Sequence, residues 1–296
     1  MKEHRMELSA QKMAGDSVPP VARVKRRAEP VSGRLLANVI LLLIGAYFVI
    51  PVLWLAVGAV DKHAGWQIQL PTLTLDNFIA ALAHGNAQAL WNSVIVSTIA
   101  AIVSTGAGTL AAYSFSRHRI PWKGPILLGI LFLSGVPVTI LIVPIYKMFA
   151  RYDMLSIVPT AVLLGVTSLP FAIYLIKNTI DAIPRDLEEA ACMEQAGTFR
   201  ILRSVIVPLA MPGIASAAIF SFVNAWGNFL IPIVLIADQS SQPAPIAIYS
   251  FIGSATIRYG QIAAFSIIYS MPVIALYFVM SRYFKGGFSL SGAVRG

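Results

Sequence analysis

The chain has 296 residues, 57% of them hydrophobic and 12% charged, and it carries a net charge of +9. A soluble domain has roughly half apolar and about a quarter charged residues, and the apolar residues here form long uninterrupted runs, which excludes a soluble globular protein. The positive charge does not indicate a nucleic-acid partner, because the basic residues lie in segments directly beside the apolar runs.

Residues 1–34 are rich in Ala, Ser, Pro and charged side chains. This composition predicts a disordered basic tail. A signal peptide is the competing interpretation, but the apolar run after the tail is too long and no convincing cleavage site comes after it. The sequence therefore favours an uncleaved first span over residues 35–60.

The apolar runs predict an all-α membrane protein, because they lack the strict alternation of barrel strands. Prolines inside two of the runs do not contradict this, since neighbouring helices can satisfy the freed carbonyl groups. We expect six transmembrane helices, over residues 35–60, 90–114, 125–148, 157–176, 211–236 and 263–283.

The distribution of basic residues predicts the orientation. Eighteen of the 22 lie in the N-terminal tail, between spans two and three, between spans four and five, and in the C-terminal tail 284–296 together with Arg282 at the end of the sixth span. The positive-inside rule makes these segments cytoplasmic, both termini included. The two longer loops, 61–89 and 237–262, then face outward, and the second is polar enough to reach an external partner.

The segment 183–212 is the longest charged, helix-prone stretch between apolar runs, and it predicts two short helices around Gly197. Asp186 is the expected N-cap of the first helix, with Glu189 completing a capping box. Gly197 suits the end of that helix, and Thr198 can cap the next one. A polar helix pair between membrane spans is best explained as a surface that a soluble partner binds.

Enzyme signatures are missing from the sequence, which has no HExxH, GxSxG or P-loop pattern, so any ATP must be bound by another subunit. Glu188 and Glu189 are adjacent, and neighbours in a helix point about 100° apart, so they do not converge on one bond. The spans are almost free of the ionisable groups that a proton-coupled carrier needs. An intramembrane enzyme or a scaffold remains the alternative from another class.

The fifth span offers the clearest candidates for a solute path. Asn224 and Asn228 are four residues apart, which would place them on one helix face beside Trp226. Hydrogen bonding between helices is the simpler explanation, and we weigh it slightly above solute contact. An aromatic ring beside amides also suits a sugar. Further candidates for the same path lie in spans three and four: Tyr146, Ser168 and Tyr174.

The segment 183–212 resembles a family motif that begins with Glu-Ala-Ala and ends with an apolar residue and proline. Residues 189–191 match its start and Val207-Pro208 match its end at the proper spacing. Glu194 stands where the family usually has Asp. Gln195 replaces the usual Gly, and Gly197 is positioned to supply the turn instead. Further similarity covers most of the chain: residues 73–78, 92–93, 111–113, 226–229 and 291–296.

On these residues the chain resembles the membrane subunit of an ATP-binding-cassette importer, in the carbohydrate branch exemplified by the second maltose-transporter membrane subunit. The resemblance implies a type I importer permease fold, with a core over 90–283 and cytoplasmic coupling helices at 183–207. The residues that would contact the ATPase are then Glu188, Glu189, Ala190, Ala191, Glu194 and Gly197.

The same resemblance implies the partners and the activity. A homologous second permease subunit, two cytoplasmic ATPase subunits that bind ATP and Mg, and an extracytoplasmic solute-binding protein would complete the importer in a bacterial or archaeal cell membrane. This chain would bind no cofactor or metal and catalyse no reaction. The expected solute is a di- or oligosaccharide, and the alternative is a glycerol phosphate derivative or another polyol.

Overall fold

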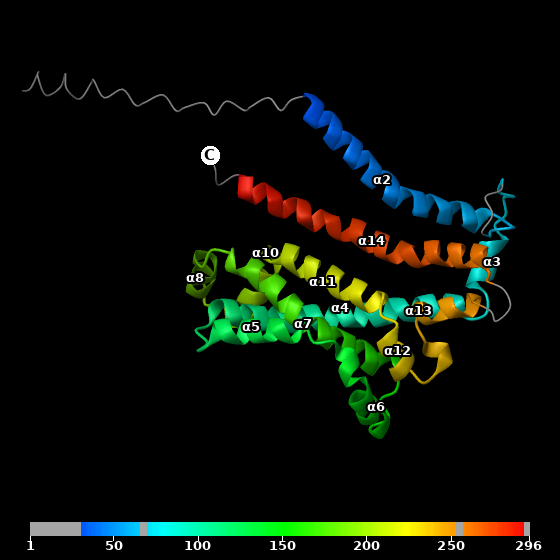
Figure 1. Ribbon diagram of the computed structural model, residues 1–296. Coiled ribbons are helices and arrows are strands. Elements are labelled where there is room, and N and C mark those ends of the chain that lie inside the picture. Colours follow the sequence, from blue (N-terminus) through cyan, green and yellow to red (C-terminus); the bar gives the residue numbers. More distant parts are fainter. Residues whose placement is uncertain (1–30, 66–69, 253–256, 293–296) are drawn as a thin grey trace, which may run out of the picture. The chain divides into compact units, whose positions relative to one another are not determined.

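The computed structural model describes residues 31–65, 70–252 and 257–292 (Figure 1). Nearly all of these residues are helical, and they include two isolated β-bridges but no strand. The predicted all-α class is confirmed. Most of the predicted N-terminal tail, residues 1–30, lies outside the described residues, as do residues 293–296.

Four helices are long and apolar enough to cross a membrane. They are Asn38–Val60, which is part of α2 (Val31–Val60), then α4 (Asn86–Arg117), α7 (Ile157–Asp181) and Tyr259–Ser281 in α14 (Tyr259–Gly292). α14 continues through nine residues that the sequence assigned to a tail. These four correspond to the predicted spans one, two, four and six.

The number of spans reaches the predicted six when each of two bent helix pairs is counted as one span. In the first pair, α5 (Lys123–Leu133) meets η1 (Val138–Leu141) and α6 (Ile142–Arg151) at a bend of 74°. Pro137 precedes η1 with extended backbone, which stops α5 from continuing. In the second pair, Thr198–Leu209 meets α11 (Met211–Trp226) at 78°, and Pro212 occupies the first turn of α11.

The prediction of one continuous helix over 211–236 is wrong. α11 ends at Trp226, and a short separate helix, α12 (Leu230–Leu235), comes after it. In a continuous helix Pro232 would clash with the carbonyl of residue 228 and leave it unpaired, whereas proline is tolerated in the first turn of a new helix. Asn228 stabilises that new start, because its Oδ1 accepts the N–H of Ile231 at 3.1 Å.

The described chain divides into two units at Pro51, which lies inside α2. Residues 39–50 of α2 expose large apolar side chains, with Leu42 at 73% and Tyr47 at 74%. A helix segment that is apolar on all sides fits a lipid environment and not water. The second unit begins at Val52 and contains the other five spans.

Small residues let α4 and α7 pack closely, and α11 packs against both. Ala100, Ala161 and Ala172 are fully buried between these helices, and a Cβ on Gly108 would lie 3.3 Å from Ala172 Cβ. α4 is joined to α11 by a buried hydrogen bond of 2.6 Å from the Ser104 hydroxyl to that of Ser221. Close backbone approach with occasional hydroxyl bonds is how membrane helices associate.

Gly165 in α7 lies in close contact with α4, and we expect Gly165→Ala to lower the free energy of unfolding by about 1–3 kcal/mol. A Cβ at this position would lie 2.8 Å from the Ala100 carbonyl oxygen and 2.9 Å from Val103 Cβ, so the two helices must separate. Gly106→Ala is the matched control, since its Cβ meets nothing within 4 Å. Thermal unfolding in detergent tests this, and equal midpoints for the two variants would contradict it.

The segment 61–89 contains α3 (Asp76–Leu82), which is tied to the end of α2. The Asn77 amide donates to the carbonyls of Ala59 and Asp61 at 3.1 and 2.8 Å. The Asp61 carboxylate in turn accepts the backbone N–H groups of Thr72 and His63. These donors hold the pKa of Asp61 below its ordinary value.

Candidate functional site

Residues 182–210, here called the elbow, lie at the Arg117 end of α4, opposite the end that holds α13 (Ala244–Ala247; Figure 1). The elbow contains α8 (Asp186–Met193) and α9 (Thr198–Ile201), then a π-helical turn, η2 (Leu202–Ile206), and α10 (Val207–Leu209). The sequence therefore forms two short helices around residues 194–197, where the motif predicts a turn.

An apolar underside fixes the elbow to the helices below it. Ile183, Ile201 and Ile206 are buried in one cluster with Tyr113 of α4 and Ile180 of α7. Ala191 packs against the same cluster from α8. Since the underside is held in this way, the opposite face of α8 is presented in one fixed orientation.

A buried ion pair pins α8 to α4. Arg117 Nε contacts Glu188 Oε1, and the two side chains are only 9% and 13% exposed. The Tyr113 hydroxyl donates to the other carboxylate oxygen of Glu188 at 3.2 Å, and Arg117 Nη2 donates to the Ile183 carbonyl at 2.9 Å. A mostly buried pair needs such additional hydrogen bonds to offset its desolvation.

The pair extends into a network that reaches α7. Arg117 Nη1 donates to the Ser116 hydroxyl at 3.3 Å, and that hydroxyl donates to Asp181 Oδ1 at 2.6 Å. Lys177 forms an ion pair with the other oxygen of Asp181. The ends of α4 and α7 and the start of α8 are therefore one bonded unit, which we call the pin network: Tyr113, Ser116, Arg117, Lys177, Asp181 and Glu188.

The structure separates the predicted coupling residues into two groups. Glu189, Ala190, Glu194 and Gly197 are exposed, whereas Ala191 is half-buried. Glu188 points inward, where Arg117 and Tyr113 occupy its carboxylate, so it positions α8 and offers no free charge to a partner.

Sequence reasoning missed three apolar side chains beside the acidic ones, namely Leu187, Met193 and Phe199, which are 45%, 85% and 73% exposed. An exposed surface that mixes apolar and acidic groups is typical of a protein-docking site. The sequence contains a signal for these three residues, because large apolar side chains are unexpected within a charged segment.

The predicted side-chain caps are wrong. Arg185, not Asp186, precedes α8, and no side chain caps either short helix. The N–H groups that a side-chain cap would bind, those of Glu188 and Glu189, are satisfied by the Arg185 carbonyl at 2.9 and 3.0 Å. Asp186 and Glu189 still favour the helix start electrostatically.

Gln195 makes the turn that the sequence assigned to Gly197. Its φ is +59°, in the left-handed region, while Gly197 is extended at φ −69° and ψ 159°. The Gln195 N–H donates to the Cys192 carbonyl at 2.9 Å, and the Ala196 N–H donates to that of Ala191 at 3.1 Å. This pair of bonds is a Schellman motif, which explains why glycine is usual at this position.

We expect Gln195→Gly to stabilise the protein by about 1 kcal/mol, because glycine adopts positive φ without the clash of a Cβ. Gly197→Ala is the control and should be nearly neutral, since its added Cβ meets nothing within 4 Å at an ordinary φ. Thermal unfolding measures both. A lower midpoint for Gln195→Gly would show that the Gln195 side chain has a stabilising role.

The predicted solute-path residues do not form one face. Asn224 is exposed on α11 and lines a groove of about 450 Å³ with Phe171, Leu175, Ser216, Phe220 and Val223. Asn228 lies beyond the end of α11, so the prediction that it shares a helix face with Asn224 is wrong. Tyr146 and Tyr174 are exposed but lie outside this groove, and Ser168 is buried with its hydroxyl bonded to the Leu164 carbonyl.

Trp226 is a packing residue in this chain and is only 3% exposed. Its ring stacks with Phe222 and with Tyr269 of α14, at centroid distances of 5.6 and 5.0 Å. The Tyr269 hydroxyl donates to the Trp226 carbonyl at 2.6 Å. This arrangement joins the end of α11 to α14, and Trp226 does not line the groove beside Asn224.

Residues 104–288 match the model of a family described as binding-protein-dependent transport system inner membrane component. The chain belongs to this family. The match includes the elbow, the whole pin network and the groove beside Asn224, and it confirms the resemblance to importer permeases drawn from residues 189–208.

Relatives and solved structures agree with the family. The permease is 32% identical to the trehalose transport system permease protein SugB of Mycobacterium tuberculosis, over 86% of this chain and 95% of that one. It is 30% identical to the diacetylchitobiose uptake system permease protein NgcG of Streptomyces coelicolor, over 86% and 87%. Its fold matches a bacterial ABC transporter involved in import of the acidic polysaccharide alginate, with a TM-score of 0.71, 21% identity and 86% and 98% coverage.

Proposed function

We propose that this permease forms half of the translocation path of an ATP-driven importer for a neutral di- or oligosaccharide. The observation that carries the proposal is the elbow, whose underside is pinned by Glu188 and Arg117 while Glu189 and Ala190 stay exposed. The names of relatives support the solute class, since they are permeases for trehalose, diacetylchitobiose and arabinooligosaccharides.

The partners are inferred from the elbow and from the family. An ATPase subunit binds the exposed face of α8, where Ala190 permits close approach and Glu189 and Glu194 face basic or backbone N–H groups. Met193 contributes apolar contact area. ATP and Mg reside in two such ATPases, while a homologous second permease subunit and an extracytoplasmic solute-binding protein complete the importer. The permease itself catalyses no reaction.

Force applied to α8 has a direct route into the spans. The pin network joins α8 to the end of α4 through the ion pair of Arg117 and Glu188, and it joins α4 to the end of α7 through the hydrogen bond from Ser116 to Asp181. These three elements therefore move together. α7 and α11 line the groove that contains Asn224. Movement of the elbow therefore changes the groove, and Asn224 is the path residue that we retain, whereas Ser168 and Trp226 act in packing.

The groove favours a neutral solute over a glycerol phosphate derivative. Its lining combines the rings of Phe171 and Phe220, whose centroids are 4.1 Å apart, with Ser216 and Asn224, and includes no basic residue. An anionic solute would need a cation there, whereas sugar rings suit aromatic faces beside amides and hydroxyls.

Uptake by the reconstituted complex tests this function. Proteoliposomes that contain both permease subunits, the ATPases and ATP should accumulate radiolabelled trehalose or another disaccharide only when the binding protein is added on the other side. Uptake that needs no ATP, or chemical conversion of the solute by this chain alone, would contradict it and favour a carrier or an enzyme.

The single cysteine of the chain tests the orientation. Cys192 is exposed on α8, and our proposal places it with both termini in the cytoplasm of a bacterial or archaeal cell. A membrane-impermeant maleimide should label this subunit in inverted vesicles and not in intact cells. Labelling in intact cells would place the elbow outside and overturn the proposed function.

A further inference from the structure

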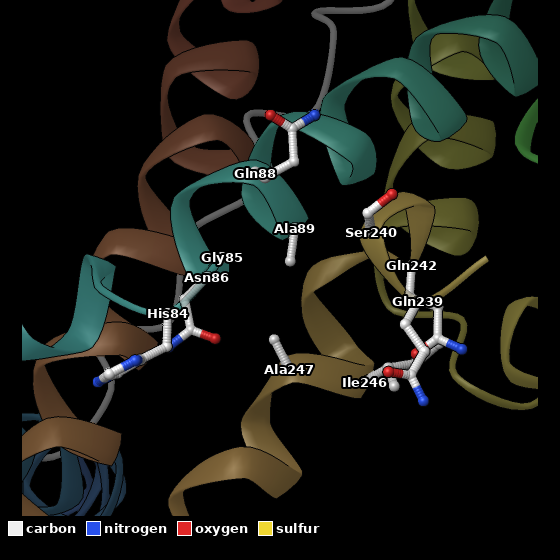
Figure 2. A pocket seen from close by; sticks show the side chains of 10 residues that line it. All are labelled: His84, Gly85, Asn86, Gln88, Ala89, Gln239, Ser240, Gln242, Ile246 and Ala247. Carbon is white, nitrogen blue, oxygen red and sulfur yellow. The ribbon is translucent and has the colours of Figure 1, made fainter.

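A polar cleft of about 550 Å³ lies at the Asn86 end of α4, opposite the elbow (Figure 2). One wall is the turn before α4 and its first turn, with Asn86 and Ala89. The other wall is formed by residues 239–247. Figure 2 shows Ala89 and Ala247 facing each other across the hollow, with the amide of Asn86 on one side and those of Gln239 and Gln242 on the other.

The second wall is held rigidly against α4. The Asn92 amide donates to the carbonyls of Ser240 and Gln242 at 2.8 and 3.1 Å, and the Ser93 hydroxyl accepts the Ala244 N–H at 2.8 Å. The cleft therefore exists before a ligand arrives, which lowers the entropy cost of binding. These contacts also give Asn92 and Ser93, noted in the sequence for their resemblance to the family, a structural role.

Asp238 closes the turn that begins this wall. Its carboxylate accepts the Ser240 N–H at 3.0 Å and the hydroxyls of Ser240 and Ser241 at 2.6 and 2.7 Å. Hydrogen bonds from the two serines hold the pKa of Asp238 below its ordinary value, so the carboxylate stays ionised at neutral pH. Its hydrogen bonds all lie within the turn 238–241, and Asp238 does not line the cleft.

Asn86 is the observation that points to a ligand. The residue is only 5% exposed, yet its side-chain amide makes no hydrogen bond to any residue that the structure describes. The amide atoms are not among the fully buried side-chain atoms that lack a partner, so they open onto the cleft that Asn86 lines. Its partner is therefore expected to come from a molecule that enters the cleft.

The lining selects the class of that ligand. It offers amides, a hydroxyl and an imidazole, but no Asp, Glu, Lys or Arg, so it matches neutral hydroxyl groups and not an anion. The volume falls within the range of small-molecule sites. A docking protein segment usually presents or meets aromatic and arginine anchors, and no such residue lines this cleft.

We propose that this cleft is a carbohydrate-binding site on the outward face of the permease, separate from the groove beside Asn224. It rests on the proposed function, which supplies the outward orientation and the sugar class. The cleft holds one or two rings of a neutral sugar through Asn86, Gln239 and Gln242, next to the entrance of the path.

Saturation-transfer NMR on the full complex in nanodiscs tests the site, with neither ATP nor binding protein present. The probes are trehalose, maltose and diacetylchitobiose, with glycerol 3-phosphate as the anionic comparison. Asn86→Leu and Gln239→Leu should each weaken the affinity for the bound sugar by about fivefold, the loss of one hydrogen bond. The matched control is Gln261→Leu, which removes an amide on α14 outside the cleft and should leave the affinity unchanged.

Three results would overturn the site. The first is that none of the three sugars binds, and the second is that the cleft variants and the control bind sugar with equal affinity. The third is that the cleft variants lose association with the binding protein while their sugar affinity is unchanged. The last would identify the cleft as a protein-docking surface. Equal thermal midpoints show that the variants are folded. Failure of ATP-driven uptake is a separate result, because sugar binding here needs no ATPase coupling.

Discussion

We expect Arg117→Met to abolish ATP-driven uptake and to lower the free energy of unfolding by about 2–4 kcal/mol, slightly below the range for a fully buried pair. The change leaves the Glu188 carboxylate, 13% exposed, with the Tyr113 hydroxyl as its remaining partner, and it frees the Ile183 carbonyl. α8 then loses its link to α4. Uptake in proteoliposomes and thermal unfolding measure the two effects.

A double-mutant cycle distinguishes the coupling of Arg117 with Glu188 from a general loss of stability. Arg117→Met combined with Glu188→Leu replaces both charges with apolar groups, so most of the stability should return. Uptake should stay low, because the hydrogen bonds from Arg117 to Ile183 and Ser116 are not restored. Strictly additive losses of stability would show that the two side chains are not coupled. This result would contradict the role of their ion pair in holding α8 to α4.

Glu189→Lys is expected to have the second large effect, on assembly and not on folding. Glu189 is exposed and has no ion pair or side-chain hydrogen bond among the described residues, so the thermal midpoint should not change. Reversal of charge on the docking face should weaken ATPase binding by about tenfold or more, since a like-charge contact at an interface costs several kcal/mol. Co-purification and stimulated ATPase activity measure it.

Asp76→Lys is the control for Glu189→Lys, since it reverses another exposed carboxylate at the opposite end of α4. It should leave ATPase binding intact. Normal recovery of the ATPase with Glu189→Lys would show that the exposed face of α8 is not the docking surface. Glu189→Gln should have a smaller effect, because it removes attraction without adding repulsion.

The spans could be predicted because crossing a bilayer requires long apolar runs, and these are visible in the sequence. The break after Trp226 was missed for the same reason. Residues 227–236 are mostly apolar, so their hydropathy predicts one continuous span. Pro232 and the capping amide of Asn228 instead determine that the helix ends and a new one begins. The length and polarity of a segment therefore predict its environment well, but they do not predict its backbone geometry.

The elbow was located by its motif, but its internal organisation could not be predicted. Pairing of Glu188 with Arg117 joins residues 71 positions apart, and nothing local distinguishes Glu188 from Glu189. The cap assignment is wrong because the Arg185 carbonyl, and not the Asp186 side chain, accepts the N–H groups of Glu188 and Glu189. The sequence assigns the turn to Gly197 because glutamine seldom adopts positive φ. In the structure residues 191–196 form the Schellman motif, and Gly197 takes no part in it.

The π-helical turn at Leu202–Ile206 has a consequence for how the fifth span is phased. A π turn holds about one residue more than an α turn, and each helical residue rotates the rest of the helix by about 100°. Shortening this turn by one residue would rotate α10 and change the point at which the chain enters the 78° bend before α11. Ser221 would then no longer be placed to face Ser104, so the length of this five-residue segment fixes how α11 is set against α4.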